Sequence, residues 1–213
     1  MIKAVLWDFG GVITSSPFDA FNRFESENGI PKDFIRGINA TNPTTNAWAQ
    51  FESSQISIEA FDKLFEEESK AAGHAIAGHK VLLLLAGDVR PEMVNALKIC
   101  KANFKIGCIT NNVKSDKGSA VPQTSDKEKQ MAEILQLFDE VVESSIEGVR
   151  KPNPKIYQIA LKRMDIKAEE CVFLDDLGIN LKPAKALGMK TIKVLNGKQA
   201  LEELEQYTGL KLL

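Results

Sequence analysis

The chain has 213 residues, of which 44% are hydrophobic and 26% are charged, with 27 Lys and Arg against 29 Asp and Glu. This composition is typical of a globular protein with enough apolar surface for a sizeable core. Because the charges nearly balance, no strong field attracts nucleic acid or an anionic membrane surface, and we expect neither as a partner.

The cysteines and the apolar runs set expectations about the compartment. Cys100, Cys108 and Cys171 are odd in number and lie in or beside apolar runs. We interpret them as reduced, buried thiols, which suits a cytoplasmic protein; a disulfide is the weaker interpretation. The run Ile2–Trp7 is too short for a secretory signal peptide, so we expect none. The longest apolar run, Val81–Ala86, is far shorter than a membrane-spanning helix.

The first predicted element is a strand, Ile2–Trp7, which ends at Asp8. Gly10 and Gly11 follow, and glycine permits positive φ and close approach of the backbone to another group. An aspartate at such a place is by itself more often a turn former than a functional residue. Its neighbours along the chain decide between the two interpretations.

The next segment, residues 17–87, contains helical periodicity and no convincing strand, as in FDAFNRFESEN and SIEAFDKLFEEESKAAG. Since both of its ends return to strand-and-helix elements, we predict a helical cap domain inserted over the carboxyl ends of the strands. Residues 1–16 and 88–213 would then form the core domain. Trp48 and Phe51 are candidates to contact a substrate, although packing inside the cap is at least as good an interpretation.

From residue 88 onward, helices and strands alternate with short connections. Pro91 and Pro154 suit the first turns of two helices, and Gly188 suits the end of a third. The predicted elements are helix Arg90–Asn103, strand Lys105–Thr110, a helix from Pro154 to Met164, strand Cys171–Leu174, a helix over residues 180–188, strand Thr191–Leu195 and helix Lys198–Tyr207. This alternation predicts an α/β fold, a doubly wound parallel sheet of Rossmann-like type. The polar stretch Asn112–Lys127 has no assigned role.

Polar residues follow the predicted strands at their carboxyl ends, where open α/β sheets bind ligands. Asp175 and Asp176 form an acidic pair that suits a divalent cation, or else a helix N-cap. Thr110 and Asn111 could hold phosphate oxygens or merely form a turn. Lys151 could offset the carboxylates, or lie at the surface. Each signal alone is weak, but together they favour one site. His74 and His79 are the only histidines, and we interpret them as surface residues rather than zinc ligands.

The stretches WDFGGVI, CITNN, RKPNPKIY and FLDDLGIN together resemble the four ordered motifs of the haloacid dehalogenase (HAD) superfamily. The resemblance covers essentially the whole chain, with a helical cap between the first and second motifs. It is most similar to the phosphatase domain of soluble epoxide hydrolases and to the domain preceding acyl-CoA dehydrogenase family 10 enzymes. The resemblance implies hydrolysis of a small phosphorylated metabolite, with magnesium as cofactor, by a monomer or homodimer.

The resemblance also assigns roles to individual residues. Asp8 would be the nucleophile and form an aspartyl-phosphate. Thr110 and the amide of Asn111 would bind phosphate oxygens, and Lys151 would orient Asp8 and neutralise charge. Magnesium would be held by four residues: Asp8, the carbonyl of Gly10, Asp176, and Asp175 directly or through water.

Gly10 departs from the pattern of most HAD phosphatases, which have a second aspartate at this position as general acid and base. Such catalysis contributes about 10²–10⁴-fold to the rate. Either another group supplies the proton, or turnover is slow, or the substrate has a leaving group that needs little help. Our hypothesis is that activity favours activated acyl or aryl phosphates over simple alkyl esters. Two alternatives remain open: a metal-independent haloacid dehalogenase, which the acidic pair Asp175–Asp176 disfavours, and a phosphate-binding regulatory module without turnover.

Overall fold

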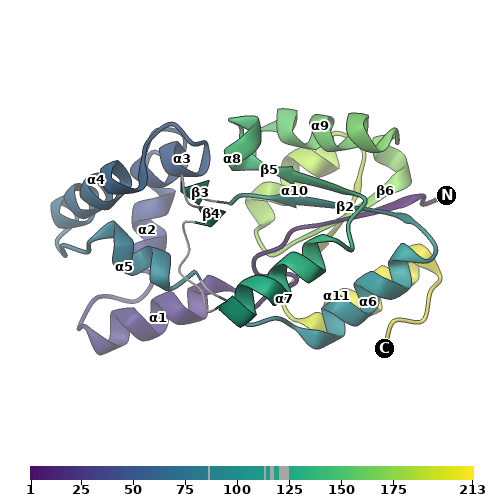
Figure 1. Ribbon diagram of the computed structural model, residues 1–213, viewed down its shortest axis with the longest axis horizontal. Helices are drawn as coiled ribbons and strands as arrows, with labels where there is room; N and C mark the ends of the chain where they lie inside the picture. Colours follow the sequence, from purple (N-terminus) through teal and green to yellow (C-terminus); the bar gives the residue numbers. More distant parts are fainter. Residues whose placement is uncertain (86, 113, 116–117, 120–124) are drawn as a thin grey trace.

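The computed structural model describes residues 1–85, 87–112, 114–115, 118–119 and 125–213. Its centre is a five-stranded parallel sheet in the order β5-β2-β1-β6-β7, with helices on both faces (Figure 1). The strands are β1 (Ala4–Trp7), β2 (Lys105–Thr110), β5 (Glu140–Glu143), β6 (Cys171–Asp175) and β7 (Lys190–Lys193). The predicted α/β doubly wound fold is confirmed.

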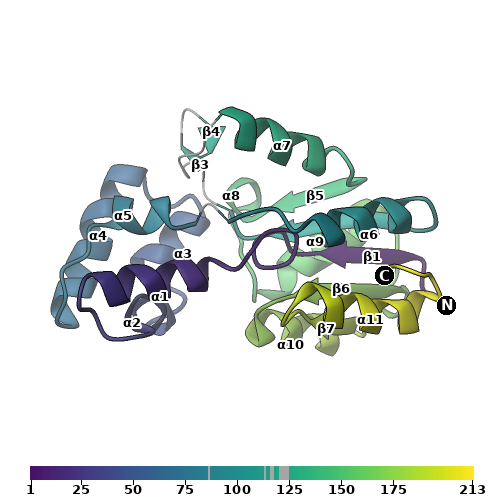
Figure 2. The same ribbon diagram turned by 90° about the horizontal axis from the view of Figure 1, so that it is seen from below.

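The two faces of the sheet pack against different helices (Figure 2). Side chains of β1 alternate, so that Val5 and Trp7 enter one apolar cluster while Ala4 and Leu6 enter the other. The first cluster contains residues of α6 (Pro91–Lys101), α7 (Ser125–Leu135) and α11 (Gly197–Thr208). The second contains residues of α9 (Pro154–Met164) and α10 (Gly178–Ala186). Burial on both faces explains why these strands are continuously apolar.

Local signals fix several helix starts where the sequence predicts them. The Asn153 side chain accepts a hydrogen bond from the N–H of Lys155, with Pro154 in the first turn of α9. Asn196 caps α11 in the same way through the N–H of Gln199. The strand predicted over Thr191–Leu195 is instead β7, Lys190–Lys193, and β5 was not predicted. The sequence of β5, EVVE, has only two apolar residues at its centre. This suits a strand at the edge of the sheet that is only partly buried, but it gives a weak strand signal.

Residues between β1 and α6 form a separate group of helices at one end of the molecule, which we call the helical unit (Figure 1). Its members are α1 (Pro17–Glu27), α2 (Phe34–Ala40), α3 (Ala47–Glu52), α4 (Ile58–Ala71) and α5 (Gly78–Leu83). They share an apolar cluster of their own, around Phe21, Phe61 and Phe65. The helical unit therefore has a core distinct from the two clusters that cover the sheet.

The two chain crossings into the helical unit lie side by side. Thr14 and Val89 form an isolated antiparallel bridge, and the N–H of Ser15 donates to the carbonyl of Asp88. The N–H of Arg90 donates to the carbonyl of Ile13. The domain boundaries expected at residues 16 and 88 stay a prediction.

Three smaller features complete the description. The two-residue strands β3 (Lys114–Ser115) and β4 (Gly118–Ser119) pair with each other, and α8 (Ser144–Glu147) follows β5. Much of the polar stretch Asn112–Lys127 lies outside the described residues.

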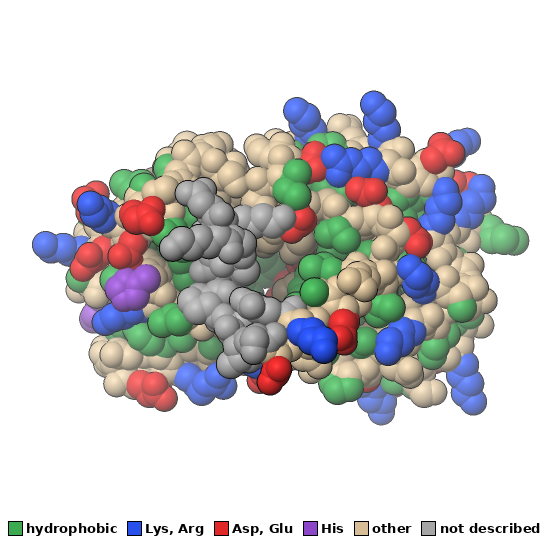
Figure 3. Space-filling model, in the orientation of Figure 1, with side chains coloured by type: hydrophobic (Ala, Val, Ile, Leu, Met, Phe, Trp, Pro, Cys, Tyr) green, Lys and Arg blue, Asp and Glu red, His purple; other side chains and the backbone are tan. Residues whose placement is uncertain are grey.

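Within the described part of the chain, no helix has the length and apolar character needed to cross a membrane. Lys, Arg, Asp and Glu side chains are interspersed on the face drawn in Figure 3.

Candidate active site

The site is built at the carboxyl ends of β1 and β6, the two adjacent strands at the centre of the sheet. Asp8 directly follows β1, Asp175 ends β6, and Asp176 comes next. Because the strands are parallel and paired in register, these side chains emerge at the same edge. One carboxylate oxygen from each of the three lies within 4.8 Å of the other two. The sequence thus folds three acids into one cluster.

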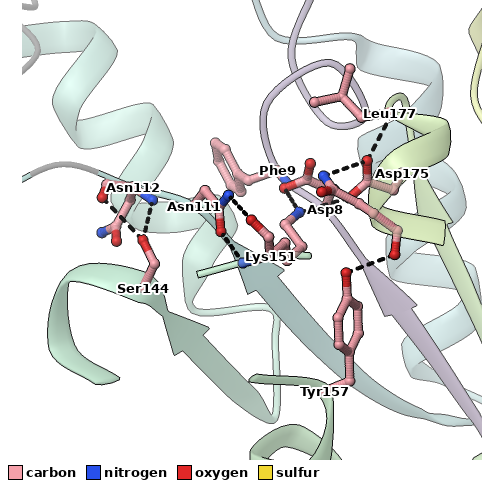
Figure 4. Close-up of polar contacts among 10 residues, drawn as sticks. Asp8, Phe9, Asn111, Asn112, Ser144, Lys151, Tyr157, Asp175 and Leu177 are labelled. Carbon is pink, nitrogen blue, oxygen red and sulfur yellow. Dashed lines mark hydrogen bonds and ion pairs between the residues drawn. The ribbon is translucent and has the colours of Figure 1, made fainter. Parts of the chain in front are cut away.

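The Lys151 ammonium lies inside this cluster (Figure 4). Its Nζ is 2.8 Å from Asp8 Oδ1 and 2.7 Å from Asp175 Oδ2, and its side chain is only 1% exposed. Burial opposes the charge of Lys151, but Asp175 and Asp8 together raise its pKa well above the ordinary value. Lys151 is therefore a buried residue whose charged form two acids stabilise, and the interpretation of it as a surface residue is wrong.

The three acids of the cluster carry more negative charge than the described residues around them compensate. Three carboxylates face one ammonium, which leaves an excess of two negative charges. Burial raises the pKa of Asp8, against the opposing effect of Lys151. Burial, followed by the charge of Asp175, raises the pKa of Asp176 to about 6. A divalent cation held by carboxylate oxygens would relieve this excess.

The two acids after β6 are held differently. Asp175 is fully buried, and its oxygens accept hydrogen bonds from the N–H of Leu177 and the amide of Asn180 as well as from Lys151. Asp176 is only partly buried, and its Oδ2 accepts a hydrogen bond from Ser16 Oγ at 3.2 Å. The arrangement makes Asp175 a fixed partner of Lys151 and leaves Asp176 more open to a cation.

Asp8 is oriented by bonds to one of its two oxygens. Oδ1 accepts from the N–H of Phe9 at 2.7 Å and lies against Lys151. Among the described residues, Oδ2 accepts no hydrogen bond. Asp8 thus keeps a free oxygen in a buried site, where a nucleophile or a metal ligand would be expected.

The two glycines after Asp8 have different structural roles. Gly11 has a φ of 76°, and a Cβ on it would collide with the Asp176 carboxylate. At Gly10 a Cβ would meet nothing within 4 Å, and the residue is exposed. Gly11 is therefore required by the backbone and by Asp176, whereas position 10 has room for a side chain.

Of the two predicted phosphate-binding residues, Thr110 and Asn111, Asn111 contacts Lys151 directly. Thr110 ends β2 and is partly buried. The Asn111 side chain donates to the carbonyl of Lys151 at 3.0 Å and accepts from its N–H at 2.8 Å, as Figure 4 shows. These two bonds explain why the backbone that carries Lys151 is fixed next to β2.

The two aromatic residues proposed to contact substrate lie in the helical unit. Phe51 is 2% exposed and stacks on Phe61 with ring centroids 4.6 Å apart. Its ring therefore packs in the apolar core of the helical unit, which was the alternative to substrate contact. Trp48 is partly buried and meets Phe61 edge-on. The cysteines are free and buried, as expected.

Sequence reasoning missed several residues that support the site. Ser16, Asn112, Ser144 and Asn180 all make hydrogen bonds in or next to it. Asn180 lies five residues after Asp175, in the first turn of α10, so its spacing is a signal that could have been used. The others meet the site only through tertiary contacts.

Comparison with known proteins agrees with this geometry. Residues 2–188 match the haloacid dehalogenase-like hydrolase family, and the chain belongs to that family. It is 33% identical to mouse (Mus musculus) acyl-CoA dehydrogenase family member 10 and 32% identical to mouse bifunctional epoxide hydrolase 2. These matches cover 99% and 98% of the chain but only 19% and 39% of the relatives' lengths.

Other relatives have a length similar to that of this chain. A protein of Methanocaldococcus jannaschii named glyceraldehyde 3-phosphate phosphatase is 28% identical, over 98% of the chain and 91% of its own length. A solved HAD-like hydrolase from Porphyromonas gingivalis aligns with a TM-score of 0.68 at 21% identity, covering 99% of this chain and 100% of that one. An L-2-haloacid dehalogenase from Xanthobacter autotrophicus aligns with a TM-score of 0.60 at 16% identity, covering 100% and 86%. At such identities the two structures show the fold alone.

The contrast between the two glycines gives a first prediction. Gly11→Ala should lower the free energy of unfolding by about 1–3 kcal/mol, because alanine is strained at positive φ and displaces Asp176. Gly10→Ala should change it by less than about 0.5 kcal/mol. Urea denaturation of both variants measures this. Equal losses in the two variants would contradict the assigned geometry.

A second prediction concerns Asp176 in protein kept free of metal by EDTA. Since the folded state raises the pKa of Asp176 from 3.8 to about 6, its charged form destabilises the fold above pH 6, and this penalty disappears as pH falls toward 4. Asp176→Asn should therefore be more stable than wild type at pH 7.5, by on the order of 2 kcal/mol. The advantage should vanish near pH 4. A constant difference across this range would show that Asp176 is not strained by its neighbours.

Proposed function

We propose that this protein is a magnesium-dependent phosphatase that hydrolyses a small phosphorylated metabolite through an aspartyl-phosphate on Asp8. The observation that carries the proposal is the buried Asp8 carboxylate, which Lys151 holds by one oxygen beside the acids Asp175 and Asp176. Two relatives that are named as phosphatases match this chain over 91% and 97% of their own lengths, which supports the same chemistry. The three free, buried cysteines fit the reducing conditions of the cytoplasm.

The donor set fits magnesium, which prefers hard oxygen ligands and retains several waters. Asp8, Asp176 and the carbonyl of Gly10 would hold the ion. Asp175 would act through water or through Lys151, because Leu177 and Asn180 already donate to its oxygens. When bound, the ion supplies neutralisation of charge on the phosphoryl oxygens and on the acids.

The chain's own residues would carry the reaction. The free oxygen of Asp8 attacks phosphorus as the bond from phosphorus to the leaving oxygen breaks, which leaves a phosphoryl group on Asp8. Water then attacks that phosphorus, releasing inorganic phosphate and restoring the carboxylate. Lys151 holds Asp8 in line, and Thr110 and the amide of Asn111 bind the non-bridging oxygens. The rate enhancement comes from positioning and electrostatics.

The departing oxygen has no carboxylic acid at position 10 to protonate it. An aryl or acyl phosphate leaves as a weakly basic anion and needs little help, whereas an alkyl phosphate needs a proton. The space that a side chain at position 10 would enter is open, so no neighbouring side chain takes the place of the missing acid there. Activated phosphates are therefore the preferred substrates in this proposal.

The helical unit would act as the cap, with boundaries near residues 17 and 87. It would select the leaving group, because the groups on the sheet side address only phosphate and metal. Trp48, which is partly buried next to α4, is the aromatic residue better placed for such contact. Phe51 would support it from the core of the unit.

A panel of phosphorylated metabolites, with 4-nitrophenyl phosphate and a 2-haloacid added, tests the function. We expect phosphate release that requires magnesium and stops in Asp8→Asn. Halide release without metal would replace the proposal by a dehalogenase. Binding of phosphate and magnesium without any turnover would replace it by a regulatory module.

Gly10→Asp gives a sharper prediction about the leaving group. Because a side chain fits at position 10, the new carboxylate should speed alkyl phosphate hydrolysis by about 10²-fold or more, within the usual range for general acid–base catalysis. The rate with 4-nitrophenyl phosphate should rise less. Gly10→Asn, of nearly equal volume but unable to transfer a proton, is the control. Unchanged alkyl phosphate rates in Gly10→Asp would mean that another group already supplies the proton.

A further inference from the structure

One ion pair between a buried glutamate and a partly buried arginine joins the helical unit to the sheet side of the molecule. Arg150 Nε lies 2.7 Å from Glu52 Oε2, and the two side chains are 22% and 8% exposed. Among the described residues, neither atom has a hydrogen-bond partner elsewhere. Arg150 Nη1 also donates to the carbonyl of Pro43 at 3.0 Å. A single guanidinium therefore binds two segments of the helical unit, one before α3 and one at its end.

A second set of contacts joins the same segments through α8. Ser144 Oγ donates to the carbonyl of Glu52 at 2.7 Å and accepts from the N–H of Asn112 at 3.1 Å. Ser54 Oγ donates to the carbonyl of Ser145 at 2.9 Å. Glu52, the last residue of α3, and Ser54, two residues beyond it, are thus tied to α8, and α8 is in turn bonded to Asn112 in the segment that follows β2.

Arg150 is adjacent in sequence to Lys151, and the two side chains bind opposite parts of the molecule. Lys151 reaches Asp8 and Asp175, whereas Arg150 reaches the helical unit. Asn111 holds the backbone between them by two hydrogen bonds to Lys151. A shift of the helical unit would therefore pull on the backbone next to Lys151.

The electrostatics of Glu52 agree with this connection. Burial raises its pKa, whereas the charges of Arg150 and Lys151 oppose this rise. The site lysine is thus close enough to act on a carboxylate that belongs to the helical unit. Removing one partner of a buried ion pair leaves an uncompensated charge, and such pairs break at a high cost.

We propose that Glu52 and Arg150 are a positioning pair, whose ion pair closes the helical unit over the site and at the same time seats Lys151 between Asp8 and Asp175. The inference rests on the proposed function for its catalytic part and on the structure alone for closure. Neither residue touches the reacting atoms. Their effect is exerted through Lys151 and through the contact of α3 with the sheet side.

The test compares Glu52→Gln and Arg150→Gln with the matched control Arg163→Gln. Arg163 pairs with Glu140 of β5 at 3.2 Å and with Glu147 of α8 at 2.8 Å, and neither pair includes a residue of the helical unit. With 4-nitrophenyl phosphate and magnesium, both test variants should lose kcat by about 10- to 100-fold with less than about a threefold change in KM, as expected for a small misplacement of a catalytic group. The control should keep its kcat.

Acrylamide quenching of tryptophan fluorescence gives a readout that needs no activity. Trp7 is fully buried, so the quenchable signal reports Trp48, which lies in α3, the same helix as Glu52. Quenching should increase in both test variants and not in Arg163→Gln. The exchanged pair Glu52→Arg with Arg150→Glu should recover part of both properties.

The outcomes separate the two claims. Increased quenching in an enzyme without phosphatase activity would uphold closure by the ion pair and refute the proposed function. Wild-type kcat and wild-type quenching in folded Glu52→Gln and Arg150→Gln would overturn the positioning pair. A reduced kcat with unchanged quenching, or equal changes in Arg163→Gln, would also overturn it, because the effect would then not come from closure.

Discussion

The buried Lys151 ammonium is the interaction on which the rest of the site depends. It is in contact with Asp8 and Asp175 and almost inaccessible to solvent. A charge in that position is tolerated only because carboxylates surround it, and the carboxylates in turn are tolerated because of it. The balance is incomplete, since the cluster contains three acids and one ammonium, which leaves an excess of two negative charges. In the proposed function, this excess of negative charge is what a bound divalent cation would offset.

The fold delivers these charges by simple means. Parallel strands β1 and β6 end side by side, so the residues after them converge without any long loop. Gly11 allows the chain to turn past Asp176, and Asn111 ties Lys151 to the end of β2. Three segments that are far apart in sequence are thus fixed relative to one another by strand pairing and side-chain hydrogen bonds. Such preorganisation is what electrostatic catalysis requires.

The parts of this arrangement that depend on local pattern could be predicted from the sequence. Continuous apolar runs with an acid at the end predicted β1 and β6, and Asn153 with Pro154 predicted the start of α9. The parts set by tertiary contact could not. Glu52 reads as the polar end of a short amphipathic helix, and only the structure places it on Arg150.

Phe51 and β5 are two further cases in which tertiary contacts decide what the sequence leaves open. An aromatic residue has equal reason to face a ligand or its neighbours, and here the stacking with Phe61 decides in favour of the core. An edge strand such as β5 needs few apolar residues. Its short sequence therefore does not reveal that it pairs with β2.

The most direct test of the account is to find where the phosphoryl group goes. Wild-type protein mixed with 4-nitrophenyl phosphate and magnesium is quenched in acid within the first turnover, reduced with borohydride and digested for mass spectrometry. The account predicts conversion of Asp8, and of no other acid, to homoserine, with more trapped intermediate in wild type than in Gly10→Asp. Release of nitrophenol in a burst with Asp8 unmodified, or modification of another residue, would contradict it.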